Sequence, residues 1–155
     1  MPHPLVEVRA LTEYTPEVAA DLGRLTLDLS ESATGEPVPE DRLRRLIEND
    51  AYEQLVAEHQ GRIVGSATLT WLGGIMPGNK AYLEDFVTDP EFRRVGVAHK
   101  MWRAIGEWCI AEYDFVKLDF TSRYTLEDAH KFYKDHGATI RDDTAPFRAI
   151  FTKKR

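Results

Sequence analysis

Apolar and polar positions in the first third of the chain predict a strand, a helix and a loop. Residues 5–11 alternate with a period of two, which is typical of a half-buried strand. Thr15 and Pro16 are a typical N-cap and first helical residue, and they predict a helix that runs to about Leu29. Ser30–Pro39 contains a glycine, two prolines and three hydroxyl residues, so we expect an irregular segment there. This segment is either a substrate-gating loop or a simple connector.

The middle of the chain predicts a hairpin followed by a βα unit. A helix is expected over residues 40–49, and apolar strands over 53–58 and 63–71 flank a turn that contains Gly61. Glycines and prolines over residues 73–78 then break the chain. The pattern that follows predicts a strand over Lys80–Thr88 and an amphipathic helix over Val95–Tyr113.

The last third predicts shorter elements. Residues 115–121 are rich in β-branched and aromatic side chains, as in a strand, and residues 126–136 predict a helix that Gly137 ends. Two short strands are expected over 139–141 and 147–152. Because strands alternate with helices over residues 80–121, we expect a βαβ unit with parallel strands, within a mixed sheet packed between helices.

Length and composition indicate one globular domain. The 155 residues are 43% hydrophobic and 30% charged, with a net charge of −6, which argues against a nucleic acid partner and is compatible with a cationic substrate. Cys109 is the one cysteine, so no disulfide can form within the chain. No apolar run approaches the roughly 20 residues of a membrane span, and the N-terminal residues lack the apolar core of a signal peptide. We therefore expect a cytoplasmic protein without a membrane partner.

Two segments could carry chemistry. Arg93, Arg94 and Gly96 lie where the long helix should begin, and the unpaired N–H groups of a helix N-terminus bind anions such as phosphate. The alternative is a glycine that allows close packing, with solvated arginines around it. In the second segment, Ala129–Gly137, helical spacing places Tyr133 at the edge of a buried face, where a tyrosine can also be a simple core residue. His130 and His136 lie on different helix faces, so no metal site is expected.

Together the two segments resemble the GNAT superfamily of acetyl-coenzyme A-dependent N-acetyltransferases. Arg93, Gly96 and Ala98 fit its pyrophosphate motif [RQ]-x-x-G-x-[GA], and Ala129–Gly137 looks like its A-x-x-F-Y-x-x-x-G segment. The resemblance implies a single GNAT-like acetyltransferase domain over residues 1–155. It also implies an α/β (α+β) fold with about four helices and a mixed, mostly antiparallel sheet of six to seven strands around a central parallel pair.

The resemblance also implies roles for individual residues. Acetyl-coenzyme A would be the co-substrate, and Tyr133 would donate a proton to the leaving thiolate. Many members carry an asparagine that contacts the pantetheine arm of the cofactor, and this chain has Leu126 at that position. Cofactor-binding residues implied by the family are Phe86, Val87 and Thr88 along the pantetheine, and Arg93, Arg94, Val95, Gly96, Val97 and Ala98 at the pyrophosphate.

The acceptor amine must lose a proton before it attacks. An alkyl amine with a pKa of about 10 is neutral in only about one molecule in a thousand at pH 7, so a base or a water should accept its proton. Glu84 and Asp85 lie just upstream of the cofactor-binding strand segment. Alternation favours Glu84, which has the parity of Phe86 and Thr88, and a β-bulge would reverse that choice. Either carboxylate could instead be structural.

The leading hypothesis is an N-acetyltransferase that acts on a primary amine of a small molecule or peptide by direct attack, without a metal. The alternatives are a non-catalytic acyl-coenzyme A-binding or regulatory module, which Leu126 favours, and an interaction domain with a vestigial cleft. The sequence does not identify the acceptor. It also leaves the oligomeric state open, including a homodimer.

Overall fold

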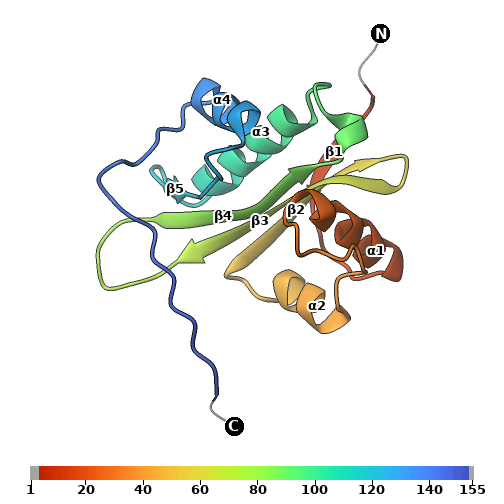
Figure 1. The fold of residues 1–155 in the computed structure, drawn as a ribbon, viewed down its shortest axis with the longest axis horizontal. Coiled ribbons are helices and arrows are strands. Elements are labelled where there is room, and N and C mark those ends of the chain that lie inside the picture. Colours follow the sequence, from red (N-terminus) through yellow and green to blue (C-terminus); the bar gives the residue numbers. More distant parts are fainter. Residues whose placement is uncertain (1–3, 154–155) are drawn as a thin grey trace. The chain divides into compact units, whose positions relative to one another are not determined.

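A computed structural model describes residues 4–153 of the chain. It forms two compact units, one that extends to Phe120 and one that begins at Thr121. The first unit contains the sheet, with three of the helices described here (Figure 1). Its elements are β1 (Glu7–Ala10), α1 (Pro16–Leu25), the 3-10 turn η1 (Thr26–Asp28), α2 (Glu40–Glu48), β2 (Tyr52–His59), β3 (Arg62–Leu72), β4 (Lys80–Thr88), the 3-10 turn η2 (Pro90–Phe92), α3 (Val97–Ile110) and β5 (Lys117–Asp119).

Local signals position the first elements as expected. The hydroxyl of Thr15 accepts a hydrogen bond of 3.1 Å from the N–H of Val18, so Thr15 is the N-cap of α1. Gln60 and Gly61 connect β2 to β3 with φ angles of 50° and 78°. Two positive φ angles are typical of the type I′ turn, whose twist matches that of the two strands. Ser30–Pro39 contains no regular element after a short turn at its start.

The described residues form a five-stranded sheet in the order β1-β2-β3-β4-β5. The pairs from β1 to β4 are antiparallel, and β4 and β5 are parallel, as the βαβ pattern predicts. The prediction of six to seven strands is wrong, because residues 139–141 and 147–152 form no strand. As a result β5 is the outer strand of this sheet, and the parallel pair lies at its edge instead of its centre.

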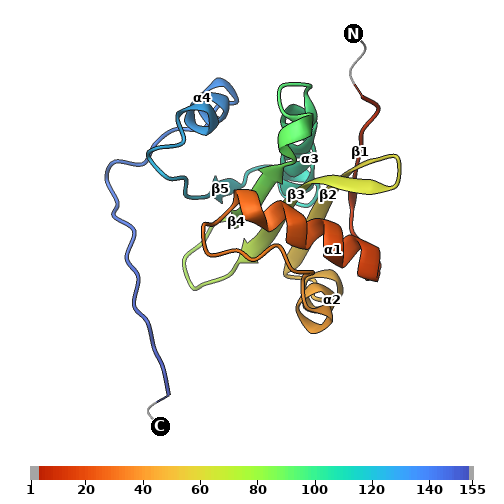
Figure 2. The same ribbon diagram turned by 45° about the vertical axis from the view of Figure 1, so that its right-hand side comes forward.

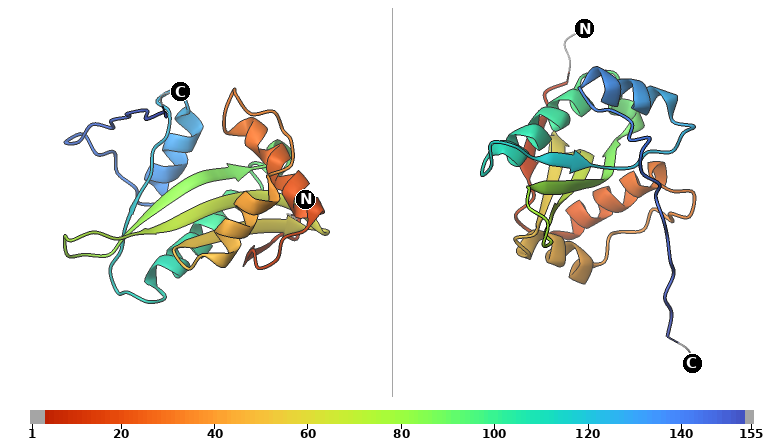
Figure 3. Two further views of the ribbon diagram at one scale, coloured as in Figure 1. Left: turned by 90° about the horizontal axis from the view of Figure 1, so that it is seen from below. Right: turned by 90° about the vertical axis from the view of Figure 1, so that its left-hand side faces the viewer.

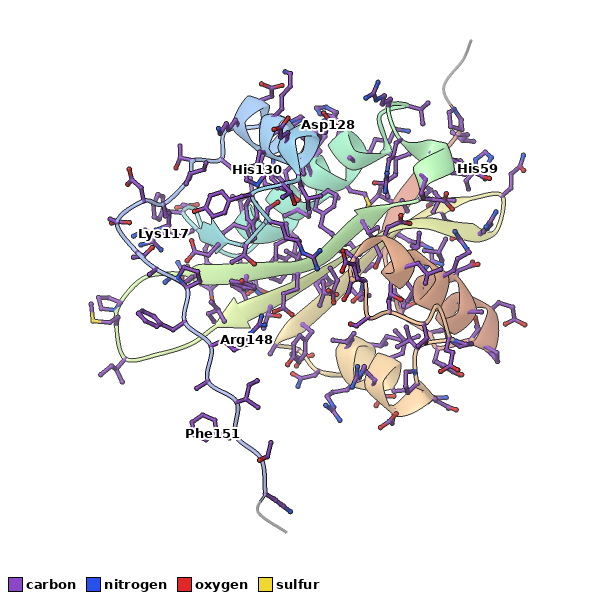
Figure 4. The ribbon with its side chains drawn as sticks, viewed as in Figure 1. His59, Lys117, Asp128, His130, Arg148 and Phe151 are labelled. Atoms are coloured by element: carbon purple, nitrogen blue, oxygen red, sulfur yellow. The ribbon has the colours of Figure 1, made fainter. Side chains whose placement is uncertain are left out.

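The final segment has apolar residues but no packed face. Phe147, Ile150 and Phe151 are 96%, 80% and 93% exposed, and Figure 4 shows the labelled Phe151 extending from an irregular stretch of chain. A strand needs a partner edge as well as strand-forming residues, and the sequence pattern shows only the residues. This difference explains why the pattern predicted strands here that the structure does not contain.

Helices cover both faces of the sheet in the first unit (Figure 2). On one face, α1 and α2 bury Leu22, Leu25 and Leu43 against Val56 and Val87. On the other face, α3 is buried along the predicted stripe of Val97, Met101 and Ile105, but the stripe ends on Cys109 and not on Trp108, which is half-buried. We call these two faces of the sheet the α1/α2 face and the α3 face.

A stack of aromatic rings joins α3 to the sheet. The rings of Trp71 in β3 and Trp108 in α3 are stacked with centroids 4.4 Å apart, and Tyr113 meets Trp71 edge-on at 5.3 Å. The carboxylate of Glu53 accepts a hydrogen bond from Trp108, while burial raises the pKa of this carboxyl. The stack therefore packs the end of α3 onto the sheet.

The second unit contains one helix, α4 (Glu127–Asp135), among its described residues. The N–H of Ala138 donates to the carbonyl of Tyr133 at 2.9 Å, and the N–H of Gly137 donates to Lys134 at 3.1 Å. Gly137 has a φ of 91°. These bonds form a Schellman motif, so Gly137 ends α4 as predicted.

Candidate active site

The two candidate segments lie in different units. Residues from Glu84 to Ala98 form one continuous corner of the first unit, where β4 passes through η2 into α3. Tyr133 lies on α4 in the second unit.

A β-bulge interrupts β4 at the predicted base. Thr68 pairs with Glu84 and Ser66 pairs with Val87, so Asp85 and Phe86 together oppose the single residue Ala67. Asp85 has a φ of 51°, which a non-glycine residue rarely adopts outside such a feature. The sequence-based preference for Glu84 assumed unbroken alternation, and that premise is wrong.

The bulge changes which side chains share a face. Glu84 lies opposite Thr68 on the α1/α2 face, together with Val87, whereas Phe86 packs on the α3 face. Burial raises the pKa of the Asp85 carboxyl above its ordinary value of 3.8. A raised pKa makes the Asp85 carboxylate a stronger base than an ordinary aspartate, so the bulge residue Asp85 stays a candidate proton acceptor.

β4 and β5 separate beside these residues. Their parallel pairing covers Lys80, Ala81 and Tyr82, and ends where Tyr82 meets Asp119. β4 continues to Thr88, so among the described residues 83–88 pair with a strand on the β3 side alone. The backbone groups that face the other way can hydrogen-bond an extended ligand, in the manner of an added strand.

The hydroxyl of Thr88 needs a partner. Its oxygen is buried and makes no hydrogen bond within the part of the chain that the structure describes. A buried hydroxyl left unpaired destabilises the protein by about 1–3 kcal/mol, and such a group often marks a ligand position. Thr88 is one of the three strand residues that the family resemblance assigns to the cofactor.

Asp89 connects β4 to the turn that follows it. Its side chain is 4% exposed and accepts hydrogen bonds from Arg24 Nη1 at 2.5 Å and from the N–H of Glu91 at 3.0 Å. Burial alone would raise the pKa of this carboxyl, but the N–H of Glu91 and the Arg24 guanidinium together hold it below its ordinary value. Arg24 also donates to the carbonyl of Ile63 at 3.1 Å, so the pair ties α1 and β3 to the corner.

The helix α3 begins at Val97, two residues later than the sequence pattern predicts. Gly96 is the N-cap with a φ of 87°, and no side chain caps this end of the helix. The first bond within the helix runs from the N–H of Lys100 to the carbonyl of Gly96, so the preceding N–H groups have no partner within the helix. They are the donors that an anion would use.

The surroundings of this helix end are open. A Cβ atom at Gly96 would meet no atom within 4 Å, so the left-handed backbone is the reason for glycine there. The alternative of a glycine chosen for close packing is therefore wrong. Arg93 and Arg94 are exposed, and Arg93 Nη2 lies 3.5 Å from Asp28 Oδ1. The positive charge of Arg93 is thus partly balanced by Asp28.

Tyr133 is half-buried on α4, with its ring edge-on to Phe132 at a centroid distance of 5.8 Å. Burial raises the pKa of its phenol above 10. The hydroxyl therefore stays protonated at neutral pH, which is the form that can donate a hydrogen bond.

The sequence did not predict the ion pair between Asp89 of the corner and Arg24 of α1. The dipeptide Asp89-Pro90 is typical of a turn start and could have indicated Asp89. Nothing in the sequence connects Arg24 to it, because the two residues are 65 positions apart and meet only in the fold.

The family assignment rests on a sequence comparison. Residues 24–138 match the model of the acetyltransferase (GNAT) family, and this range includes the corner and Tyr133. The chain belongs to the GNAT acetyltransferase family. The resemblance inferred from the two motifs is confirmed. Among the curated proteins, none matches this sequence.

Solved structures agree with this fold. An aminoglycoside acetyltransferase from an uncultured soil metagenomic sample is 20% identical, with a TM-score of 0.80 over 95% of this chain and 97% of that one. A second such enzyme from a soil sample is 23% identical, with a TM-score of 0.74 over 96% and 99%. The glucosamine-6-phosphate N-acetyltransferase of Arabidopsis thaliana is 17% identical, with a TM-score of 0.74 over 96% and 99%. At these identities the likeness establishes the shared fold.

Two further findings concern residues 4–153. No helix in this range is long and apolar enough to cross a membrane. The same residues hold no group of three or more His, Cys, Asp or Glu side chains that could bind a metal ion.

Proposed function

We propose that this GNAT family member works as one domain over residues 1–155 and transfers an acetyl group from acetyl-coenzyme A to a primary amine of a small molecule or peptide. One observation carries the proposal: within the described residues, the pairing of β4 with β5 ends at Tyr82, and the β4 edge beyond it leads into a helix N-terminus without a side-chain cap. The named neighbours, which acetylate aminoglycosides or glucosamine phosphate, support amino sugars as the first acceptors to test.

The corner fits the shape and charge of the cofactor. The edge of Phe86, Val87 and Thr88 can pair with the amides of the pantetheine arm, and the Thr88 hydroxyl can gain its missing partner there. The first N–H groups of α3, with Arg93 and Arg94, can bind the pyrophosphate. Acetyl-coenzyme A supplies an activated thioester. Groups of this chain accept the amine proton, stabilise the oxyanion and donate a proton to the sulfur.

Asp85 is the proposed proton acceptor, directly or through a water, with Glu84 as the alternative. The carboxylate first accepts a proton from the ammonium form and passes it to solvent; the neutral amine nitrogen then attacks, a C–N bond forms, the C–S bond breaks, and the second nitrogen proton passes to the carboxylate, while the thiolate takes its proton from Tyr133, which solvent reprotonates. A backbone N–H near Val87 stabilises the negative charge that develops on the thioester oxygen. The carboxylate returns its proton to solvent afterwards.

Tyr133 is the proposed proton donor to the leaving thiolate. A phenol with a pKa above 10 holds its proton until the C–S bond breaks, and then hydrogen-bonds or protonates the sulfur. The assignment rests on the family motif around Tyr133 and on its protonated, half-buried state.

Calorimetric titration with acetyl-coenzyme A tests the binding half of the proposal. We expect a dissociation constant in the micromolar range, and about threefold to tenfold weaker binding for Arg93→Ala, since one cationic partner of a phosphate is lost. Arg103→Ala is the matched control, because Arg103 is an exposed arginine of α3 that pairs with Glu107. No binding at millimolar cofactor, or equal weakening by both variants, contradicts the proposal.

A non-catalytic acyl-coenzyme A-binding module is the second candidate, and Leu126 favours it. This residue occupies the N-cap of α4 without a side-chain cap and stands where many family members carry the asparagine that contacts pantetheine. A thiol-release assay with amino sugars, aminoglycosides, polyamines, amino acids and peptides separates the two. Cofactor binding without thiol release from any acceptor supports the binding module.

A further inference from the structure

The α1/α2 face of the sheet is apolar at one end and polar at the other. Its apolar end contains Val56, Ile63 and Val87, which pack against α1 and α2. Toward the β3–β4 connection the pairing register defines two rows of polar side chains on the same face. One row is Gln54–Thr68–Glu84, and the next is Tyr52–Thr70–Tyr82.

Two residues of the first row, Gln54 and Thr68, are held in place by buried hydrogen bonds. The Gln54 amide accepts from the Thr68 hydroxyl at 2.7 Å and donates to the Ser66 hydroxyl at 2.6 Å. Gln54, Ser66 and Thr68 are all buried, at 4–6% exposure. A satisfied buried network fixes its members in single orientations, so the strands beneath the polar rows form a stiff base.

The second row, together with Glu84 at the end of the first row, is available to a ligand. Tyr52, Thr70 and Tyr82 are half-buried and Glu84 is exposed, and none of these four side chains makes a hydrogen bond within the described residues. Figure 3 shows the β3–β4 end of the sheet extending past α1 and α2, so neither helix covers it. We call these four residues the polar platform.

The size and charge of the polar platform indicate its ligand. Strands lie about 4.8 Å apart and same-face residues about 7 Å apart, so the three strands offer hydroxyl groups over about 10 Å beside one carboxylate. Tyrosine and threonine hydroxyls both donate and accept, which suits a ligand that carries several hydroxyl groups. The Glu84 carboxylate suits a cationic group, and Glu84 is next to the bulge residue Asp85.

We infer that the polar platform binds the acceptor, and that the acceptor is a cationic primary amine carrying several hydroxyl groups, as in an amino sugar. Glu84 pairs with its ammonium group, while Tyr52, Thr70 and Tyr82 hydrogen-bond its hydroxyls. This inference rests on the proposed function for the fate of the amine. It places the specificity of the site on side chains of the sheet.

The test compares two amines of equal ring size and charge. Glucosamine has hydroxyl groups around its six-membered ring, and cyclohexylamine has none. NMR titration of the isotopically labelled full chain should show tighter binding of glucosamine by about tenfold, because two or three added hydrogen bonds are made. The largest shift changes should fall on the amides of Thr70 and Tyr82, a readout that needs no variant.

The variant Thr70→Val/Tyr82→Phe removes two hydroxyls with little change in shape. We expect its preference for glucosamine over cyclohexylamine to fall toward one, with acetyl-coenzyme A affinity unchanged. Tyr14→Phe is the matched control, because Tyr14 is half-buried beside Arg44 of α2, outside the polar platform, and it should keep the full preference. Equal binding of the two amines by the wild-type protein, or a preference that survives the double substitution, overturns the inference.

The inference and the proposed function fail in different ways. If glucosamine binds with the expected preference but no thiol is released from acetyl-coenzyme A, the polar platform stands and the transfer reaction is wrong. If both amines are acetylated with equal KM, the transfer reaction stands and the polar platform is wrong.

Discussion

The β4–α3 corner and the helix α4 carry the two halves of the proposed chemistry, and the protein holds them in shape by different means. The corner depends on residues far apart in sequence, since Arg24 reaches Asp89 from 65 positions away. The helix α4 depends on its own neighbours, because its C-terminal bonds link Tyr133 and Lys134 to residues at most five positions later. Contacts between residues far apart in sequence thus shape the corner, and contacts between neighbouring residues shape the segment that carries the proposed proton donor.

The two regions also differ in backbone conformation. Asp85 and Arg94 of the corner adopt positive φ angles of 51° and 63° without being glycines. Each such residue is destabilising by about 1 kcal/mol or more, so the surrounding contacts must hold it in place. Just after α4, the positive φ angle at residue 137 belongs to a glycine, where it brings no such strain.

Breaking the ion pair between Arg24 and Asp89 should have the largest effect on stability. Asp89→Asn leaves Arg24 beside a neutral side chain, and we expect the free energy of unfolding at pH 7 to fall by about 3 kcal/mol, at the low end for buried pairs because Arg24 is 32% exposed. Urea denaturation followed by circular dichroism measures the change. Glu40→Gln is the control, since its solvent-exposed pair with Arg44 is screened by water and should contribute little to stability.

The pH dependence sharpens this prediction. The pKa of Asp89 is lower in the folded protein than in the unfolded chain, so its stabilisation is fully present above about pH 4 and is lost as the pH falls through the folded pKa. The difference between wild type and Asp89→Asn should therefore shrink below pH 4. A difference that stays constant down to pH 2 would mean that the charge of Asp89 is not responsible.

Changing the proton donor should affect turnover and leave binding intact. Tyr133→Phe should lower kcat by about a hundredfold, because the thiolate loses its acid, while acetyl-coenzyme A affinity stays nearly the same. Thiol-release kinetics and calorimetric titration measure the two quantities. Tyr124→Phe is the control, since Tyr124 lies in the same unit and is 88% exposed. Unchanged kcat in Tyr133→Phe would remove Tyr133 from this role.

Replacing Gly137, the glycine that ends α4, should have the smallest effect on stability. Gly137→Ala places a Cβ atom at a φ of 91° and should destabilise α4 by about 1 kcal/mol, measured by amide hydrogen exchange of residues 127–135. Gly106→Ala is a control of opposite sign. Gly106 lies inside α3 with open space around it, so alanine there should stabilise that helix by about 0.5–1 kcal/mol. Equal effects of the two substitutions would contradict the conformational explanation.

The same difference explains what the sequence could predict. The start of α1 at Thr15-Pro16, the hairpin at Gln60-Gly61 and the stop of α4 at Gly137 were predicted correctly, because each is a local signal. The bulge at Asp85 was not, since it depends on how β4 pairs with β3. The strands expected over 139–141 and 147–152 failed for a related reason, because strand formation needs a partner that the local pattern cannot show.

The residues of the candidate site also divide into those that a short sequence pattern identifies and those that come together only in the fold. The motif residues Arg93, Gly96 and Tyr133 could be named from the sequence, since each belongs to a short family pattern. The Arg24–Asp89 pair and the polar platform could not, because their residues come together only when strands and helices from separate parts of the chain pack.

The aromatic stack between β3 and α3 has a consequence for spectroscopy. The three tryptophans of the chain are Trp71, Trp102 and Trp108, and all of them lie before Thr121. Indole emission therefore comes from β3 and α3 of the first unit. A tryptophan placed at Phe132 would give α4 an optical signal of its own.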